Sequence, residues 1–385
     1  MVVIRKLNIR LVIIFFVFLL SAILASISTN FLFVSEHIRS LAAYLNPLLA
    51  FFAILSASKK ETYRLQKLIQ PLFIFLLTLG VFQVSGLLAS FESIFSFLIP
   101  RGASDSLSNI GRGVTLLATE PSRAGYELLF VYAGWRHFSE KTVRSLMLLD
   151  GLFFLYILTV IQSAMAAYLS IFYFSVLYVR HYKVSLVLIL FFVALVSFTE
   201  TRASNLIKDL FTFGSFGEIY DYIIDASGFR LISIISAYSY GITSLFGGGV
   251  GLWQTSSIVA MESAGFSAVD INFFIFHANS EFTSIRPTSY AANIALDLGV
   301  VGLAIVLILM SKYITTALRQ RRRDNNAIIW LFIFSFFLIG AVGNPVPWVL
   351  LALIVRQAQN VVKIEDNFKL GDSLKFVENK RVEYS

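Results

Sequence analysis

"LVIIFFVFLLSAILASISTNFLF", residues 11 to 33, contains no charged side chain. An α-helix of ~20 apolar residues is long enough to cross the hydrocarbon core of a bilayer. The apolar run continues into Val34 without a clear cleavage pattern. We therefore expect a retained transmembrane helix rather than a signal peptide that is removed.

Similar apolar runs recur along the whole chain. Hydrophobic residues make up 57% of the sequence and charged residues only 14%, whereas about a quarter of the residues in soluble domains are charged. We predict an all-α polytopic membrane bundle of about ten transmembrane helices, with a large outward-facing loop that contains amphipathic helices. The predicted spans are residues 11–33, 40–57, 69–90, 122–138, 145–162, 164–179, 184–200, 288–311, 327–343 and 345–357.

The basic residues predict the orientation of these helices. Of the 31 Lys and Arg residues, 23 fall in alternate loops and in the polar C-terminal part of the chain, and eight fall on the opposite side. The positive-inside rule makes the first side cytoplasmic. We expect residues 1–359 to form an integral membrane domain and residues 360–385 a cytoplasmic tail, with both termini in the cytoplasm. The net charge of +8 is then a signal of topology rather than of nucleic-acid binding.

Two outer segments, residues 91–121 and 201–287, are too long to be simple connections. Seven of the eight outer basic residues are Arg, which donates hydrogen bonds in pairs to phosphate or carboxylate and stays protonated. The chain has no Cys, and its four His show no metal-ligand spacing. We therefore expect a site for an anionic substrate in these segments, without a metal ion or another cofactor.

The first outer segment leads into "GRGVTLLATEPSRAGYE", residues 111–127. Pro121 suits the first turn of a helix, with Thr119 or Glu120 at the cap position. Glu120 and Ser122 could therefore merely cap a helix. Ionisable groups at membrane depth are usually functional, however, and this triplet has two basic neighbours, Arg112 and Arg123. The stretch is a candidate binding site.

The second outer segment supplies further candidates. Arg202 follows a predicted span, where an Arg either reaches toward the headgroups or binds a ligand. Arg230 begins residues 229–246, whose apolar spacing predicts an amphipathic helix lying in the interface. The run Gly247–Gly251, centred on Gly249, predicts either a tight turn or a close approach of backbone to a ligand.

The end of this segment places His277, Glu281 and Arg286 close together before a predicted helix. A single His in an interfacial loop is more often a satisfied polar residue than a catalyst. Arg286, which directly precedes Pro287, is the better candidate. The helix that follows carries Asn293 and Asp297 on its outer half.

These motifs, taken in order, resemble those of Wzy-type O-antigen and capsular polysaccharide polymerases, within the O-antigen ligase and polymerase superfamily. The resemblance covers roughly residues 110–310 and rests on short motifs: the Glu-Pro-Ser stretch, "TRAS" at Arg202, "GFRLI" at Arg230, the Gly-rich turn and "NIALDLGVVGL". It implies a glycosyltransferase of the bacterial inner membrane that acts without metal on undecaprenyl-diphosphate-linked oligosaccharides. A polysaccharide chain-length regulator is a further partner that such an enzyme could bind.

The chemistry of such a site follows from its residue types. No ATP is present outside the cytoplasmic membrane, so the energy must arrive in the substrate. Guanidinium groups would neutralise a departing diphosphate, and a carboxylate or imidazole would accept the proton of the attacking hydroxyl. A single displacement would invert the anomeric configuration. Glu120 is the first candidate for the proton acceptor and His277 the second.

The sequence leaves two other functions open. Ligases of the superfamily usually have a His at the start of the closing helix, where Thr288 stands in this chain. This departure makes an O-antigen ligase less favoured. A flippase or transporter for lipid-linked oligosaccharides would place ionisable groups near the middle of the bilayer and often contains inverted repeats. In this sequence such charges are few, since Glu127, Asp150 and Asp297 lie towards the ends of predicted helices, and no repeat is evident.

Overall fold

The computed structural model describes residues 9–88, 113–139, 142–179, 215, 229–320 and 322–359. Regular structure within these ranges is helical, without a strand, which confirms the all-α prediction for this part of the chain. The predicted span 184–200, the tail 360–385 and two candidate site residues, Arg112 and Arg202, lie outside the described residues.

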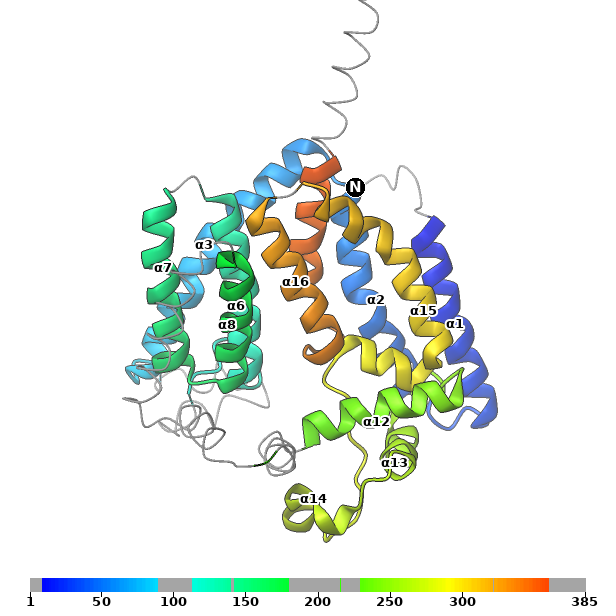
Figure 1. Cartoon of the computed structure of the whole chain (residues 1–385). Helices are drawn as coiled ribbons and strands as arrows, with labels where there is room; N and C mark the ends of the chain where they lie inside the picture. The colour runs from blue at the N-terminus through cyan, green and yellow to red at the C-terminus, as the bar shows by residue number, and fades with distance from the viewer. Residues whose placement is uncertain are drawn as a thin grey trace, which may run out of the picture.

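The first two helices, α1 (Ile9–Ser28) and α2 (Val34–Ser56), pack side by side (Figure 1). α1 ends at Ser28 rather than at the predicted residue 33. The reason is a left-handed turn, in which Asn30 and Phe31 have φ values of 49° and 62°, and which a right-handed helix cannot continue. α2 consequently begins at Val34, before the predicted residue 40.

One face of α1 is covered by none of the described residues. Phe16, Leu20 and Leu24 are 60%, 59% and 58% exposed, and their four-residue spacing places them on one side of the helix. A long apolar stripe of this kind is unfavourable in water and favourable against lipid. The packing of α1 therefore supports a membrane location.

A second group of helices follows. α3 (Lys59–Val84) begins before the predicted residue 69 because Ser58 and Glu61 form a capping box at its start. The group continues with α6 (Pro121–Phe138), α7 (Val143–Tyr156), the π-helix η2 (Ile157–Ile161) and α8 (Ala164–Tyr178). α6 packs against both α3 and α8, and Figure 1 shows these helices grouped on one side of the molecule.

The C-terminal helices are α15 (Tyr290–Leu318), α16 (Arg323–Leu338) and an unlabelled helix, Val346–Gln359. α15 is interrupted at Gly299, which has φ 65° and ψ −172°. Glycine adopts this conformation without the steric cost that a Cβ atom would add. The break separates a short N-terminal part of α15 from its longer C-terminal part.

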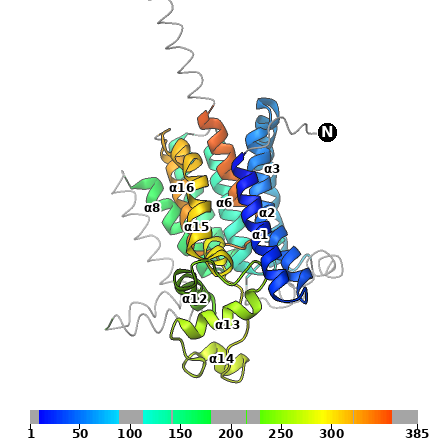
Figure 2. The same cartoon turned by 90° about the vertical axis from the view of Figure 1, so that its right-hand side faces the viewer.

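Three short helices lie together at one end of the bundle, away from the N-terminus (Figures 1 and 2). They are α12 (Phe229–Ser244), α13 (Trp253–Ser263) and α14 (Asn272–His277), with the 3-10 turn η3 (Ala268–Asp270) before the last. α12 fits the amphipathic helix predicted at residues 229–246. It packs against α15 and α13.

Four described helices are long and apolar enough to cross a membrane: Ile9–Ser28, Val34–Ser56, Lys59–Val84 and Tyr290–Leu318. Shorter apolar helices cover Ser145–Ile161, Ala164–Tyr178 and Val346–Gln359. The protein is thus a helical membrane protein. The count of ten spans stays a prediction.

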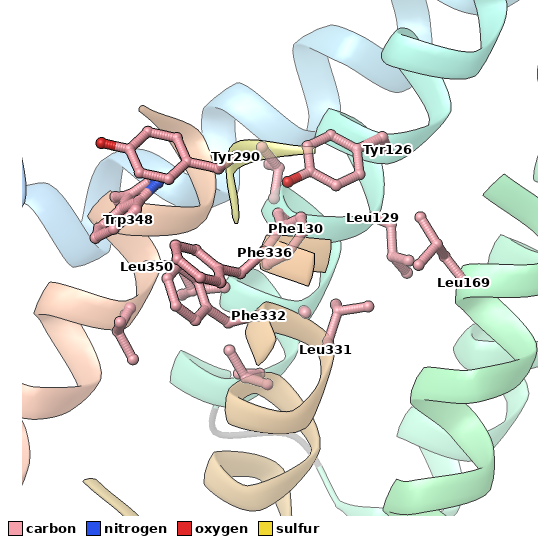
Figure 3. Close-up of a cluster of buried hydrophobic side chains, with 14 of the residues drawn as sticks. Tyr126, Leu129, Phe130, Leu169, Tyr290, Leu331, Phe332, Phe336, Trp348 and Leu350 are labelled. Atoms are coloured by element: carbon pink, nitrogen blue, oxygen red, sulfur yellow. The ribbon is translucent and has the colours of Figure 1, made fainter. Parts of the chain in front are cut away.

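The centre of the bundle is an aromatic cluster that joins three elements (Figure 3). Trp348 contacts Tyr290 and Phe332, with ring centroids 5.1 Å apart in both pairs, and Phe336 at 6.0 Å. Between helices in lipid there is little gain from exclusion of water, so close packing of this kind supplies much of the cohesion. The cluster fixes the start of α15 relative to α16 and the last helix.

A buried ion pair joins α6 and α7 near the end of α6. Arg136 and Asp150 are 4% and 1% exposed, and Arg136 Nε donates to Asp150 Oδ1 at 2.9 Å. Asp150 also accepts hydrogen bonds from Tyr132 and Tyr178, and Arg136 Nη1 donates to Asp324 of α16 at 2.6 Å. Arg136 is therefore paired inside the helical bundle. The charge pattern counts it among the 23 basic residues of the predicted cytoplasmic side.

Candidate functional site

Glu120 is the residue immediately before α6. It has an extended backbone (φ −149°, ψ 149°), and Pro121 occupies the first helical position, as the sequence predicts. The side chain of Glu120 makes no capping hydrogen bond to the helix. Instead, its Oε2 accepts a hydrogen bond from Ser122 Oγ at 3.1 Å. Capping therefore does not explain the Glu-Pro-Ser triplet.

Arg230 is the partner of Glu120. Its Nη2 donates to Glu120 Oε2, across 110 positions of sequence. The side chains of Arg230 and Glu120 are 31% and 45% exposed, so water screens the pair and its contribution to stability is small. The two segments that the sequence analysis predicts to be outer nevertheless meet here, through two of the candidate residues.

Arg230 stands on a firmly packed helix. Tyr238, two turns further along α12, donates from its hydroxyl to the carbonyl of Phe337 at 2.6 Å. Gly241 lies directly against α15, where an added Cβ atom would stand 2.6 Å from the carbonyl oxygen of Ala295. Because α12 is fixed in this way, Arg230 is presented to Glu120 with little freedom of its backbone.

The Gly-rich run binds the broken part of α15. The N–H groups of Gly248 and Gly249 donate to the carbonyls of Leu296 and Asp297, both at 2.8 Å. The break at Gly299 leaves these carbonyls without their usual partners within the helix, so the loop replaces the lost hydrogen bonds. Of the two predictions for this run, the structure shows a tight turn, and the amide of Gly249 is already in use.

The same loop packs closely against α2. Gly251 has φ 96°, and a Cβ atom there would stand 2.5 Å from His37 Nδ1. His37 Nδ1 lies 2.6 Å from the carbonyl oxygen of Val250. His37, one of the four scattered histidines, thus holds the loop in place.

Arg286 lies at the start of the closing helix and turns inward. Its Nε donates to Asn293 Oδ1 at 3.0 Å, and its guanidinium carbon lies 5.9 Å from the ring centroid of Tyr44 and 6.0 Å from that of Trp253. Cation–π contacts of this kind stabilise a charged side chain away from water. Arg286 Nη2 is buried and has no hydrogen-bond partner, so it keeps an unused donor.

A buried carboxylate lies beside this arginine. Asp297 Oδ2 accepts a hydrogen bond from the Tyr44 hydroxyl at 2.7 Å, while its Oδ1 is buried without a partner. Arg286 and Asp297 both contact Tyr44, so the three side chains belong to one cluster.

The remaining predicted site residues, Arg123 and His277, are not part of the ion pair between Glu120 and Arg230. Arg123 is exposed on the first turn of α6. His277 is the exposed last residue of α14, and its ring lies 5.2 Å from that of Phe273. Within the described part of the chain, no hydrogen bond or ion pair joins His277 to Glu120 or Arg230. The described residues also contain no group of three His, Asp or Glu that could hold a metal ion.

One polar residue near the site was missed as a candidate. Glu127, on α6, accepts a hydrogen bond at Oε1 from Asn344 Nδ2 at 2.9 Å. Its position seven residues after Glu120 was visible in the sequence. Its partner was not, because Asn344 lies between two helices far along the chain.

No protein-family model, curated protein or solved structure matches this chain significantly.

Proposed function

We propose that this protein is a glycosyltransferase that joins lipid-diphosphate-linked oligosaccharide repeat units at the outer face of a bacterial inner membrane. The observation that supports this most is the ion pair between Glu120 and Arg230. It joins the Glu-Pro-Ser stretch to the amphipathic helix of the second outer segment. A cation and a carboxylate, both reachable by solvent, are what a diphosphate leaving group and its acceptor require.

Arg230 keeps donors for the substrate. A guanidinium group has five N–H donors, and among the described residues the side chain of Arg230 donates to Glu120 alone. The free donors can approach a diphosphate oxygen in the planar geometry that arginine offers to phosphate. Glu120 then orients the guanidinium, while Arg230 meets the negative charge that grows as the diphosphate departs.

The position of α12 also suits a lipid-linked substrate. α12 lies at the end of the bundle (Figure 1), and Ile242 and Leu245 near its C-terminus are 65% and 51% exposed. Exposed apolar residues on such a helix favour insertion at the boundary between headgroups and acyl chains. An undecaprenyl chain in the bilayer would hold its diphosphate at the same depth, next to Arg230.

The proposal is tested with purified protein in lipid nanodiscs, supplied with undecaprenyl-diphosphate-linked repeat units. We expect a ladder of longer lipid-linked glycans, resolved by gel electrophoresis, that forms in the presence of a metal chelator. A known polymerase and its own substrate serve as the parallel control. Absence of longer products across repeat units of several compositions, while the control elongates, would contradict the proposal.

The same assay separates the alternative functions. A ligase would transfer a finished glycan to a different acceptor lipid and would not lengthen the undecaprenyl-linked chain. A flippase would move the substrate between leaflets without a new glycosidic bond. Elongation in nanodiscs, where no second compartment exists, is expected of a polymerase alone.

A further inference from the structure

Glu127 lies two turns into α6 and is half-buried. It is about 10 Å along the helix axis from Glu120, the residue before the helix. Arg123, four residues before Glu127 and on the same side of α6, attracts Glu127 electrostatically. The first turns of α6 and the residue before it thus carry three ionisable side chains, where a bilayer-spanning helix would normally have none.

The partner of Glu127 is a neutral amide in a fixed orientation. Asn344 Oδ1 accepts a hydrogen bond from the N–H of Val346 at 3.0 Å, so the amide nitrogen of Asn344 has to face Glu127 Oε1. No described residue forms a hydrogen bond to the second oxygen of Glu127. One carboxylate oxygen is thus anchored, and the other is open to a ligand.

The loop that carries Asn344 lies beside the middle of α2. Asn46 of α2 donates from its Nδ2 to the carbonyl of Gly343 at 2.8 Å, and Asn46 is about 18 Å along the axis from the start of α2 at Val34. Gly340 at the other end of this loop donates to the carbonyl of Thr288. Irregular backbone at such depth is tolerated where protein or water surrounds it, not lipid. Glu127 is therefore in a polar environment shared with the start of the closing helix.

On the basis of the proposed glycosyl transfer, we infer that Glu127 is the proton acceptor and that Glu120 is a positioning residue for Arg230. The acceptor hydroxyl oxygen forms a bond to the anomeric carbon of the donor sugar. The bond from that carbon to the diphosphate oxygen breaks, and the diphosphate leaves with the electron pair. The hydroxyl proton passes to Glu127 Oε2 and is later released to water.

Glu127 suits this role better than Glu120 for a geometric reason. Glu120 Oε2 already bonds both Arg230 and Ser122. A proton transferred to Glu120 would remove the attraction that positions Arg230, in the same step in which the guanidinium has to meet the departing diphosphate. Glu127 avoids this conflict because its hydrogen-bond partner is uncharged. His277 is exposed at the end of α14 and is joined to neither carboxylate by a described contact.

The test compares Glu127→Gln with wild-type protein in the nanodisc elongation assay. Gln keeps an oxygen that can accept from Asn344 but cannot take up a proton, and it also removes the negative charge of the side chain. We expect kcat to fall by about 10²–10⁴-fold, as for loss of a general base, with KM within about threefold of wild type. Glu262→Gln, the same change at an exposed position of α13, should retain wild-type kcat.

The outcomes separate this inference from the proposed function. If wild-type protein elongates glycans and folded Glu127→Gln retains kcat within about tenfold, the assignment of Glu127 is overturned while the polymerase function stands. A change confined to KM would equally overturn it, because it would show a binding role. If Glu127→Gln does not fold, Glu127→Asp is the deciding variant. Its shorter side chain keeps the charge but moves the carboxylate oxygen away from the acceptor hydroxyl. A large loss of kcat then supports the inference, and an unchanged kcat contradicts it. If wild-type protein makes no product, the proposed function itself fails.

Discussion

Two ion pairs, Arg136–Asp150 and Glu120–Arg230, lie near opposite ends of α6 and differ in their surroundings. Arg136 and Asp150 are almost completely buried, and tyrosine hydroxyls add further hydrogen bonds to Asp150. Glu120 and Arg230 are partly exposed, with Ser122 as the one additional described hydrogen-bond partner of the carboxylate. A buried, saturated pair holds helices together, whereas an exposed, unsaturated pair can exchange one partner for a ligand. The comparison supports a structural role for one end of α6 and the proposed chemistry for the other.

The largest effect is expected from Asp150→Ala. The substitution leaves the guanidinium of Arg136 buried beside Tyr132 and Tyr178 without its main counter-charge. Breaking a buried pair from one side costs about 3–5 kcal/mol of stability. We expect a marked fall in the midpoint of thermal unfolding in detergent, measured by tryptophan fluorescence.

The matched control is Asp270→Ala, the same substitution at an exposed position of η3, which should leave the unfolding midpoint almost unchanged. If Asp150→Ala were as stable as this control, the buried pair would not be a structural element. The structural role of this end of α6, and with it the contrast between the two ends, would then be wrong.

Arg230→Ala should have the next largest effect, on activity rather than on stability. Loss of a donor to the developing charge of a leaving group typically lowers kcat by about 10²–10³-fold. We expect a loss of that size in elongation, with an unfolding midpoint close to wild type because the pair is solvent-screened. Arg319→Ala, at an exposed position at the end of α15, should retain full activity. Equal elongation by the two variants would show that Arg230 does not take part in the reaction.

Local rules predicted those features of the molecule that depend on neighbouring residues in the sequence. Apolar runs predicted the positions of the helices, and Pro121 predicted the start of α6. The amphipathic spacing of residues 229–246 predicted α12 closely. Helix ends were less accurate. α3 begins at Lys59 because the polar capping box allows a helix to extend beyond its apolar run.

Features that depend on distant contacts were not predictable from one sequence. The Gly-rich run gave no sign that its amides would bind the carbonyls exposed by the break at Gly299. Arg136 lies at the end of a predicted span, and nothing near it in the sequence indicates that its partner is Asp150 of the next helix. Arg230 and Glu120 were both candidates, but only the fold could show that they form a pair. In each case two polar groups far apart in sequence satisfy one another, and no local pattern encodes that.

A smaller effect on activity is expected from Glu120→Gln. If Glu120 orients Arg230, the amide can still accept one hydrogen bond but no longer attracts the guanidinium by charge. We expect about a tenfold fall in kcat/KM for elongation, which corresponds to the loss of about 1.4 kcal/mol of transition-state stabilisation. Most of this fall should be in KM, since Arg230 would be held less firmly when the diphosphate binds. A complete loss of kcat would instead make Glu120 the proton acceptor.

The smallest expected effect is the coupling between Glu120 and Arg230 in the stability of the substrate-free protein. A double-mutant cycle of Glu120→Gln, Arg230→Ala and the double variant should give less than about 1 kcal/mol. This coupling should shrink further when the salt concentration is raised from 0.05 to 0.5 M, because screening is strong for partly exposed charges.

The same cycle at the buried end, with Asp150→Ala and Arg136→Ala, should give a larger coupling that salt hardly changes. A strong, salt-insensitive coupling between Glu120 and Arg230 would mean that this pair, too, is a permanent structural contact. Arg230 would then have no reason to release Glu120 in favour of a phosphate. The distinction between the two ends of α6, on which the proposed chemistry depends, would no longer hold.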